Sequence, residues 1–475
     1  MTVDLTGSDT SFVFTTAGKG TGDNTGLPSK AGTTQLFPLD GSAPEIDNFS
    51  GFTVAEGELV FKDDPATRRK HDIKSAVFIG MMTKDGAVDP VFTVDGAYLD
   101  NNHEVGHFFL GRNAGNANTF FKNATLRIVN GGRLDVNTPQ FGSESMPQQK
   151  YQVTVALTNG TLYGGYSLHW SNYERESNPV RILAKDSHLW GNANAVYLKG
   201  SIEADLDNTY VGKNATTPGN FWVQTWSMAN MTGSISLRNK SIFNINAWKN
   251  INLLAKQFTV SFDDSYYRWG GGDFTLQMES HGDSRVPNPD LFKLEMRGRG
   301  MIVAPASGET LTVAWPLTGE GGFVHEGEGT VAFGENTFRF NGVCEVVSGT
   351  VDLSGAGKID EVKLRGGGTV RNMTASKVRL MAEADENWNV SGLPTFDGCS
   401  LDRVVVDFGM SGASLSNELP KGIRLGKIFG GAVGDVSRWR VANTGYARVR
   451  GRFSVDADGE VSVDLERVGL AVMVR

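Results

Sequence analysis

The chain has 475 residues, with 59 Gly, 15 Pro, 2 Cys and a formal net charge of −8 at pH 7. Glycine makes up about 12% of the residues, against about 7% in an average protein. This composition excludes a disordered chain and a helical array, and no apolar run approaches the ~18 residues that a transmembrane helix needs. The acidic balance argues against a nucleic-acid partner, which requires a basic surface stripe.

Residues 1–47 are rich in Gly, Thr, Ser and Asp, and we expect them to form an N-terminal cap or a loose entry segment. A repetitive β architecture needs such a cap because its end would otherwise expose unpaired strand edges. The first five residues, Met1 to Leu5, lack the basic start and apolar stretch of a signal peptide. The chain is therefore either cytoplasmic or an exported protein whose signal has been removed.

Residues 48–409 repeat one local pattern, in which two strand-like runs are joined by a sharp turn. Asn-Gly and Gly-Gly turns supply positive φ at low steric cost, and the flanking Val, Ile, Leu and Thr alternate as in half-buried strands. The irregular spacing of the turns favours a solenoid whose coils bury one continuous core. We therefore predict an all-β fold, a single right-handed parallel β-helix, with corners at Asn130-Gly131, Asn159-Gly160, Asp186-Ser187, Asn239-Lys240, Ser348-Gly349 and Gly366-Gly367-Gly368.

Large aromatic residues recur at intervals close to the length of one coil. They are Trp170, Trp190, Tyr210, Trp226, Trp248 and Trp269. A row of rings along one face could stack on successive sugars of a glycan, because a flat ring covers the apolar face of a sugar. The alternative is that these rings pack inside the coils or under loops.

Three acidic residues, Glu203, Asp205 and Asp207, alternate along one predicted strand. Their carboxylate oxygens could bind Ca²⁺. Alternating acids also keep the outer face of a strand soluble, and no second acidic cluster completes a calcium site. We expect no other metal or cofactor.

The segment from Asn244 to Arg299 carries a candidate catalytic series. Asn244-Ile245-Asn246, Asp263-Asp264, Ser280-His281-Gly282 and Arg297-Gly298-Arg299 follow in this order. The order resembles that of β-helical pectin glycosidases, which carry Asn-x-Asp, Asp-Asp, Gly-His-Gly and Arg-x-Lys. The series departs from the family at Asn246, Ser280 and Arg299, which replace Asp, Gly and Lys.

Under an enzymatic hypothesis, the catalytic residues would be Asp263, Asp264, His281 and Arg297. Glycoside hydrolysis needs one carboxylic acid to protonate the leaving oxygen and one carboxylate to activate water or attack the sugar. The arginine would hold an acidic sugar. The competing interpretation is structural, because Asp263-Asp264 occupies the place of a corner pair.

Residues 322–353 carry the most specific motif of the chain. A Gly-x-Gly-Thr-apolar strand, an Asn-Thr-Phe corner and a Val-x-x-Gly-Thr-Val return strand are formed by Gly327, Gly329, Thr330, Val331, Phe333, Asn336, Thr337, Phe338, Gly342, Val346, Gly349, Thr350 and Val351. This segment resembles the autotransporter-associated β-strand repeat, with Phe340 and Cys344 departing from the commonest choices. The resemblance implies a bacterial β-helical passenger that is secreted or displayed at the cell surface.

The last part of the chain, residues 410–475, is predicted to form an antiparallel C-terminal β cap. Its expected strands are 423–428, 439–442, 447–453 and 461–465, with hairpin signals at 443–445 and 456–459. Helical signals are scarce, and residues 376–387 come closest to one. The two cysteines, Cys344 and Cys399, could form one bridge, but no spacing motif indicates it.

These observations predict an extracellular or surface-exposed protein with an adhesive, structural or glycan-binding role and no enzymatic activity. Its expected partner is a polysaccharide, a cell-surface glycan or a protein, without nucleic acid and without a membrane span. The alternative is a β-helical glycoside hydrolase or polysaccharide lyase acting on acidic glycans. A tailspike-like trimer would also suit a glycan-facing β-helix, although the sequence shows no trimerisation signature.

Overall fold

The computed structural model describes residues 2–6, 12–16, 34–38, 51–54, 57–73, 76–80, 88–102, 107–111, 123–142, 152–171, 179–223, 232–254, 256–280, 286–335, 337–356, 358–385, 387–410, 419–446 and 448–468. Within these ranges the chain is all-β, and the helical elements are two short 3-10 turns, η2 (Ile251–Leu253) and η3 (Val436–Arg438). No helix in these ranges is long and apolar enough to cross a membrane.

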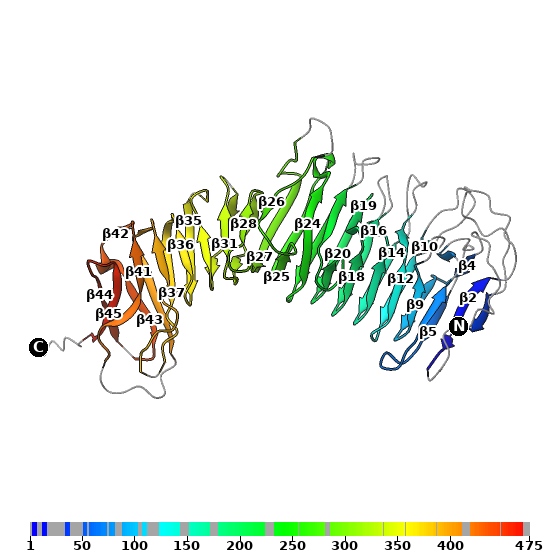
Figure 1. Ribbon diagram of the computed structural model, residues 1–475, viewed down its shortest axis with the longest axis horizontal. Helices are drawn as coiled ribbons and strands as arrows, with labels where there is room; N and C mark the ends of the chain where they lie inside the picture. The colour runs from blue at the N-terminus through cyan, green and yellow to red at the C-terminus, as the bar shows by residue number, and fades with distance from the viewer. Residues whose placement is uncertain are drawn as a thin grey trace, which may run out of the picture. The chain divides into compact units, whose positions relative to one another are not determined.

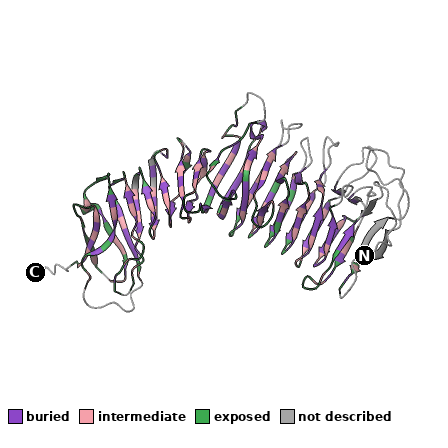
Figure 2. Cartoon of the chain, in the orientation of Figure 1, coloured by how far each residue is buried: buried purple, intermediate pink, exposed green. Residues whose placement is uncertain are grey.

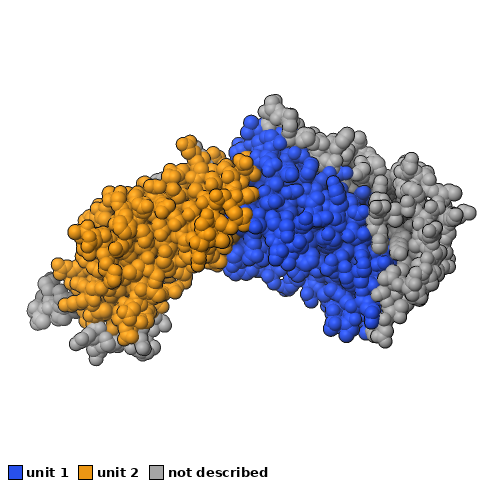
Figure 3. All heavy atoms as spheres, in the orientation of Figure 1, with its two compact units in different colours: residues 1–261, 265–270, 278–293 blue, residues 262–264, 271–277, 294–475 orange. Residues whose placement is uncertain are grey.

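The chain forms two compact units (Figure 3). Unit 1 comprises residues 1–261, 265–270 and 278–293, and unit 2 comprises residues 262–264, 271–277 and 294–475. In each unit the strands follow one another as successive parallel arrows (Figure 1).

Unit 1 contains three sets of parallel strands, which we call columns one, two and three, and most strands pair with the strand three places further along the chain. Column one contains β5 (Glu58–Lys62), β8 (Val91–Asp95), β11 (Ala124–Val129), β14 (Val153–Thr158), β17 (Val180–Lys185), β20 (Ile202–Asp207) and β23 (Gly233–Arg238). Column two contains β6 (Lys70–Ile73), β9 (Tyr98–Asn101), β12 (Arg133–Val136), β15 (Thr161–Gly164), β18 (His188–Gly191), β21 (Tyr210–Gly212), β24 (Ile242–Lys249) and β25 (Phe258–Arg268).

Column three consists of two parallel sheets. The first contains β4 (Gly51–Val54), β7 (Ala76–Ile79), β10 (His107–Leu110) and β13 (Thr138–Phe141), and the second contains β16 (Ser167–Ser171), β19 (Asn194–Leu198), β22 (Gly219–Val223) and the end of β24. At the N-terminus, β1 (Thr2–Asp4) pairs in parallel with β5, while β2 (Phe12–Thr16) and β3 (Thr34–Pro38) are antiparallel. The segment 1–47 therefore contributes strands to the sheets.

The core of unit 1 follows from strand periodicity. Along β17, the side chains of Val180, Ile182 and Ala184 are buried, and the side chains between them are exposed. The register places Ile182 between Val155 and Ala204 of the neighbouring strands, so apolar side chains stack on apolar side chains. Figure 2 shows this alternation of buried and more exposed residues along the strands. Each strand thus buries one face against its own unit.

The turns between columns one and two adopt the left-handed backbone conformation that the sequence predicts at Asn-Gly and Asp-Ser. The φ angles of Asn130, Asn159, Asp186, Asn208 and Asn239 are 54°, 51°, 51°, 46° and 53°. We call these five residues the corner ladder. The corners predicted at four of these positions are confirmed, and the corner at Asn208 was not predicted. Asn and Asp tolerate this conformation better than other residues with a Cβ atom.

Side-chain hydrogen bonds connect successive turns along the corner ladder. The Nδ2 of Asn208 donates to Oδ1 of Asp186 at 2.7 Å, and the Nδ2 of Asn130 donates to Oδ1 of Asp95 at 2.7 Å. The asparagine side chain at such a position therefore links its own turn to the turn before it by a hydrogen bond.

Unit 2 is also built from parallel strands. One set contains β27 (Phe292–Val303, from Leu294 onward), β30 (Phe323–His325), β33 (Cys344–Val346), β35 (Lys358–Arg365), β37 (Thr374–Met381), β40 (Val404–Met410) and β43 (Arg440–Thr444). A second set contains β26 (Phe274–Leu276), β28 (Thr310–Val313), β31 (Thr330–Phe333), β34 (Thr350–Asp352), β36 (Thr369–Arg371), β38 (Thr395–Asp397) and β41 (Ile423–Phe429). Shorter strands, β29 (Leu317–Gly319) with β32 (Phe338–Phe340) and β39 (Ser400–Leu401) with β42 (Ala432–Val433), complete the turns.

The motif glycines of residues 322–353 lie where neighbouring turns approach most closely. A Cβ on Gly329 would lie 2.3 Å from the carbonyl oxygen of Ala306, and a Cβ on Gly349 would lie 2.4 Å from that of Gly329. No side chain fits at these distances, so the spacing of the turns requires glycine. Asn336 of the motif lies outside the described residues.

A threonine begins each strand of the second set from β28 to β38. The threonines in register are Thr310, Thr330, Thr350, Thr369 and Thr395, and the residue that follows each is buried and apolar. The repeated unit therefore extends on both sides of the segment 322–353 that the sequence motif identifies.

The most helix-like segment of the sequence, residues 376–387, is not helical. Its first part belongs to β37, which pairs in parallel with β35 and β40. Val378 and Leu380 are buried while Arg379 between them is half-buried, which is the alternation of a strand. This period of two outweighs the Ala and Glu content that suggested a helix.

The C-terminal part of the chain mixes antiparallel and parallel pairing. β44 (Val449–Val455) and β45 (Glu460–Arg467) form an antiparallel hairpin, as predicted from residues 456–459, and β45 is also antiparallel to β41. At the other predicted hairpin, Asn443 and Gly445 do adopt positive φ, but β43 pairs in parallel with β40.

The two cysteines are separate thiols. Cys344 and Cys399 are both buried and unbridged. Burial raises the pKa of the Cys344 thiol to about 12, and burial also raises that of Cys399. Both side chains therefore act as small apolar core residues.

Candidate functional site

The outer side of column two carries a group of aromatic side chains that are open to solvent. In register along β15, β18, β21, β24 and β25 lie Thr161, His188, Tyr210, Ile242 and Tyr266, and beside them Tyr163 and Trp190. His188 is exposed, and the four larger rings are half-buried. We call Tyr163, His188, Trp190, Tyr210 and Tyr266 the column-two face.

Trp190 and Tyr210 are held on this face by their neighbours. The imidazole of His188 packs against the indole of Trp190, with ring centroids 4.8 Å apart. The hydroxyl of Tyr210 accepts a hydrogen bond of 2.6 Å from Nδ2 of Asn244, and its ring lies over Gly212, where a Cβ would come within 2.9 Å of Cε1. Gly212 thus leaves the room in which the Tyr210 ring lies.

A pocket of about 260 Å³ lies between the column-two face and the corner ladder. It is lined by Asp186, Asn208 and Lys240 on the corner side and by His188, Tyr210 and Ile242 on the column-two side. Hydrogen-bonding groups therefore stand opposite ring surfaces in one small cavity. That combination of apolar walls and a few placed polar groups is typical of ligand sites.

The pKa values of three groups on this face are shifted in the direction that favours their neutral forms. Burial raises the pKa of Tyr163 and of Tyr210, the latter against a smaller opposing effect of the Asn244 hydrogen bond. Partial burial lowers the pKa of His188. The rings consequently offer uncharged surfaces with polar edges.

Toward its N-terminal end the same side of column two becomes ionic. Asp72, Asp100 and Asp135 lie in register on β6, β9 and β12. Arg133 donates two hydrogen bonds to Asp135 at 2.7 and 2.8 Å, and Nζ of Lys70 lies 2.8 Å from Oδ2 of Asp100. These carboxylates are neutralised by their own neighbours, which gives them a structural role.

The structure separates the five described residues among the six aromatic residues predicted to form a glycan ladder. Trp190 and Tyr210 share the column-two face, whereas Trp170 and Trp248 are completely buried and Trp269 is 6% exposed. The indole of Trp170 donates a hydrogen bond of 2.8 Å to the carbonyl oxygen of Ala195. The prediction of a binding role for these three tryptophans is therefore wrong, because their rings lie in the core. Trp226 lies outside the described residues.

The structure describes three of the four candidate catalytic residues, Asp263, Asp264 and Arg297, and each has charged or backbone neighbours. Arg297 pairs with Glu295 of its own strand at 2.7 Å. The guanidinium near Asp264 is that of Arg299, at 3.4 Å, and Arg299 also lies 2.9 Å from a carboxylate oxygen of Glu326. Asp264 has a φ of 48°, the conformation of the corner ladder.

Asp263 lies beside the Arg297-Gly298-Arg299 segment of the series. Oδ1 of Asp263 lies 2.2 Å from the position that a Cβ on Gly298 would occupy, so this carboxylate packs on the backbone of β27. His281 lies outside the described residues. The arrangement around Asp264 is an ionic ladder along one side of unit 2.

The candidate calcium ligands are engaged by arginines. Arg238 forms two hydrogen bonds to Asp205, at 2.8 and 3.0 Å, and also lies 3.5 Å from Asp207. Glu203 lies 3.5 Å from Arg181. Among the described residues no group of three acidic, histidine or cysteine side chains is placed to hold a metal ion.

Sequence spacing missed a second aromatic group, on column three. His169, Tyr197 and Trp222 lie in register on β16, β19 and β22, with His169 stacked on Tyr197 at 4.2 Å. Nζ of Lys249 lies 5.4 Å from the centre of the Trp222 ring. These rings cover one another, so they offer less free surface than the column-two face.

No family model and no solved structure matches the chain. An Escherichia coli K12 protein, described as the uncharacterized protein YaiT, is 25% identical over 182 residues, which is 34% of this chain and 18% of that protein. The chain thus matches less than a fifth of the length of that relative, and the match assigns no activity.

Proposed function

We propose that this protein is a right-handed parallel β-helix of the secreted or surface-displayed passenger type and that it binds glycan without modifying it. The parallel columns, the corner ladder and the stacked glycines and threonines of unit 2 support the β-helix. The likeness of residues 322–353 to the autotransporter-associated repeat supports an extracellular setting. In this proposal the β2–β3 pair and the antiparallel strands β41, β45 and β44 act as the end caps.

The observation that carries the glycan-binding proposal is the column-two face with its pocket. Trp190 and Tyr210 offer ring surface, which covers the apolar face of a sugar, while Asp186, Asn208 and Lys240 offer hydrogen-bonding groups for hydroxyls. Neutral rings beside mixed charges suit a neutral or weakly acidic glycan. The carboxylates of Asp264 and Glu326 both pair with Arg299, and this ion pairing favours binding over hydrolysis.

Binding to a glycan array tests this proposal. Trp190→Ala and Tyr210→Ala should each weaken binding of the best glycan by about tenfold or more, because each removes roughly 1–2 kcal/mol of ring contact. Tyr197→Ala, which truncates a half-buried ring on column three, is the matched control and should leave binding unchanged. Equal losses in all three variants, or no glycan bound at all, would contradict the proposal.

An activity assay on the same glycans separates binding from catalysis. We expect neither new reducing ends nor unsaturated sugars. Product that appears with the natural chain and disappears with Asp264→Asn would instead establish the hydrolase or lyase alternative.

A further inference from the structure

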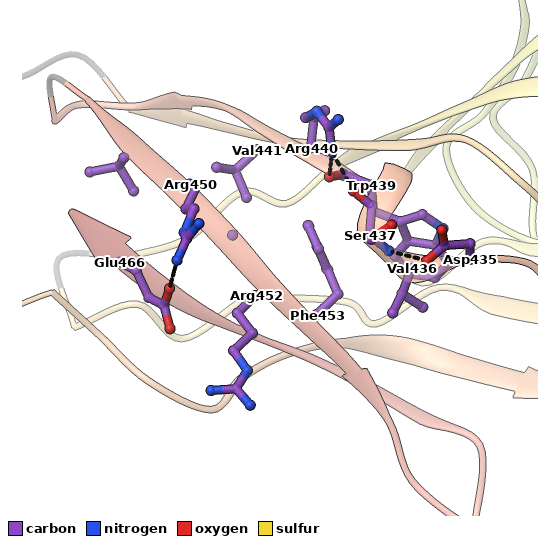
Figure 4. A pocket seen from close by; sticks show the side chains of 12 residues that line it. Asp435, Val436, Ser437, Trp439, Arg440, Val441, Arg450, Arg452, Phe453 and Glu466 are labelled. Atoms are coloured by element: carbon purple, nitrogen blue, oxygen red, sulfur yellow. Dashed lines mark hydrogen bonds and ion pairs between the residues drawn. The ribbon is translucent and has the colours of Figure 1, made fainter. Parts of the chain in front are cut away.

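A pocket of about 690 Å³ lies in the C-terminal part of unit 2 and is separate from the column-two face (Figure 4). One wall is formed by η3 and the start of β43, including Ser437, Trp439 and Val441. The opposite wall is β44, from Val449 to Phe453.

The pocket runs along the edge of β44. All five residues from Val449 to Phe453 line it, although successive side chains of a strand point to opposite sides. A cavity above one face of the strand would meet only alternate residues. Because residues of both faces line it, the pocket reaches the edge of β44, and it also reaches Glu466 on the paired strand β45.

That edge is open within the part of the chain that the structure describes. β44 is the terminal strand of its sheet and pairs only with β45, and β43 across the pocket pairs only with β40. Unpaired N–H and C=O groups at a strand edge are a template for an added strand. The open stretch of five residues is long enough for an ordinary strand.

The charge and lining of the pocket indicate what could fill it. Arg440, Arg450 and Arg452 line it, against the two carboxylates of Asp435 and Glu466. Arg450 lies 3.0 Å from Glu466, and Figure 4 marks this pair, whereas no ion pair of Arg452 is found among the described residues.

The walls add apolar surface to this basic rim. Phe453 packs edge-on against Trp439, with ring centroids 5.4 Å apart, and both rings are largely buried. Val441 of β43 lies close to Gly451 of β44, where a Cβ would come within 2.6 Å of Cγ1. An occupant with alternating acidic and apolar side chains would match both the rim and the walls.

We propose that this pocket binds an extended, acidic polypeptide segment, which adds to the open edge of β44 as a further strand. Backbone hydrogen bonds to β44 would supply affinity, and carboxylates facing Arg440 and Arg452 would supply selectivity. This interaction is independent of glycan binding, because it uses another unit and another ligand class.

Fluorescence polarisation with three labelled seven-residue peptides tests the proposal. The first alternates Val and Glu, the second alternates Val and Lys, and the third is the first with N-methylated backbone at alternate residues. We expect the acidic peptide to bind at least about tenfold more tightly than the basic one, and N-methylation to abolish binding because it removes backbone donors.

Charge reversal makes the test specific to the pocket. Arg440→Glu combined with Arg452→Glu should reverse the preference between the acidic and basic peptides. Arg403→Glu, at an exposed arginine that does not line the pocket, is the matched control and should leave the preference unchanged. Unchanged thermal melting of each variant would show that the fold is intact.

Three outcomes would overturn the proposal. Equal binding of the N-methylated peptide would show charge attraction without strand addition. Binding of a sulfated oligosaccharide, but of no peptide, in a manner that depends on Arg452 would make the pocket an anionic glycan site. Self-association in sedimentation that is lost with the Arg440 and Arg452 variants would identify a second copy of the chain as the occupant.

Discussion

A buried histidine makes the stability of unit 2 depend on pH. His325 on β30 is completely buried, and its Nε2 lies 3.1 Å from the carbonyl oxygen of Gly329. Burial lowers the pKa of His325 below its usual value of 6.5, and the contact of its ring with the backbone carbonyl of Gly329 offsets only part of that effect. The folded protein therefore holds this imidazole neutral at a pH where the unfolded chain would protonate it.

The sign of the pH dependence follows from this lowered pKa. Well above pH 6.5, His325 is neutral in both the folded and the unfolded chain, and the neutral, buried imidazole does not reduce the free energy of unfolding. As the pH falls from 6.5 toward the folded pKa, the unfolded state gains the proton first and the free energy of unfolding decreases. We expect His325→Gln, whose amide nitrogen can still donate to Gly329, to reduce the fall between pH 7 and pH 5 by on the order of 1 kcal/mol.

Denaturant unfolding of both proteins at several pH values measures this difference. His188→Gln is the control. His188 is far less buried than His325, so this variant should change the slope of the free energy of unfolding against pH less. An unchanged slope in His325→Gln would contradict the prediction.

Single residues show where sequence patterns fail. Phe323, Val324 and His325 are buried in succession, so no alternation marks His325 as a core residue. Trp170 and Trp190 are 20 residues apart, but the register of Thr161 with His188 makes this coil 27 residues long. Trp170 therefore belongs to column three and is buried, while Trp190 belongs to column two and is half-buried. A constant spacing cannot identify the column of a residue, because the lengths of the turns vary.

At the scale of elements, the turn residues were the sequence feature that predicted the positions of the corners most reliably. Asn130, Asn159 and Asp186 could be identified as corners because few residues tolerate positive φ. The strands between them followed from the period of two. The pocket beside Tyr210 could not be predicted, because it depends on the register between strands that are far apart in sequence.

The left-handed conformation of the corner ladder predicts that glycine destabilises the protein less than alanine does at these positions. At Asn130, with φ of 54°, alanine must adopt a left-handed conformation that disfavours it by about 1 kcal/mol, whereas glycine adopts it freely. Both substitutions lose the hydrogen bond to Asp95. Asn130→Gly should therefore be more stable than Asn130→Ala by about 1 kcal/mol in denaturant unfolding.

Asn389 provides the matched comparison. Its Nδ2 also donates to an aspartate, Asp385, at 3.0 Å, but its φ is not positive. Here alanine should be at least as stable as glycine, because glycine restricts the unfolded chain less. The same ranking at Asn389 and Asn130 would show that the corner conformation is not strained for alanine.

At the scale of the whole molecule, a stack of coils transmits a local defect mainly to its neighbours. Leu183 in the middle of β17 is 45% exposed, so replacing its side chain removes little core contact. It lies in register with Ala156 of β14 and Asp205 of β20. A proline here removes a ladder N–H, and we expect Leu183→Pro to destabilise the middle of unit 1 by about 2 kcal/mol or more.

Hydrogen exchange measures how far this defect spreads. Because each coil contacts mainly the next, exchange should increase in β14, β17 and β20, while β5 and β8 at the start of column one keep their protection. Leu183→Thr retains the backbone N–H and β-branching suits a strand, so this control should exchange like the natural chain. A uniform increase across unit 1 would instead mean that the unit opens as one cooperative body, in which case the column-two face and its pocket would be lost together with any single coil.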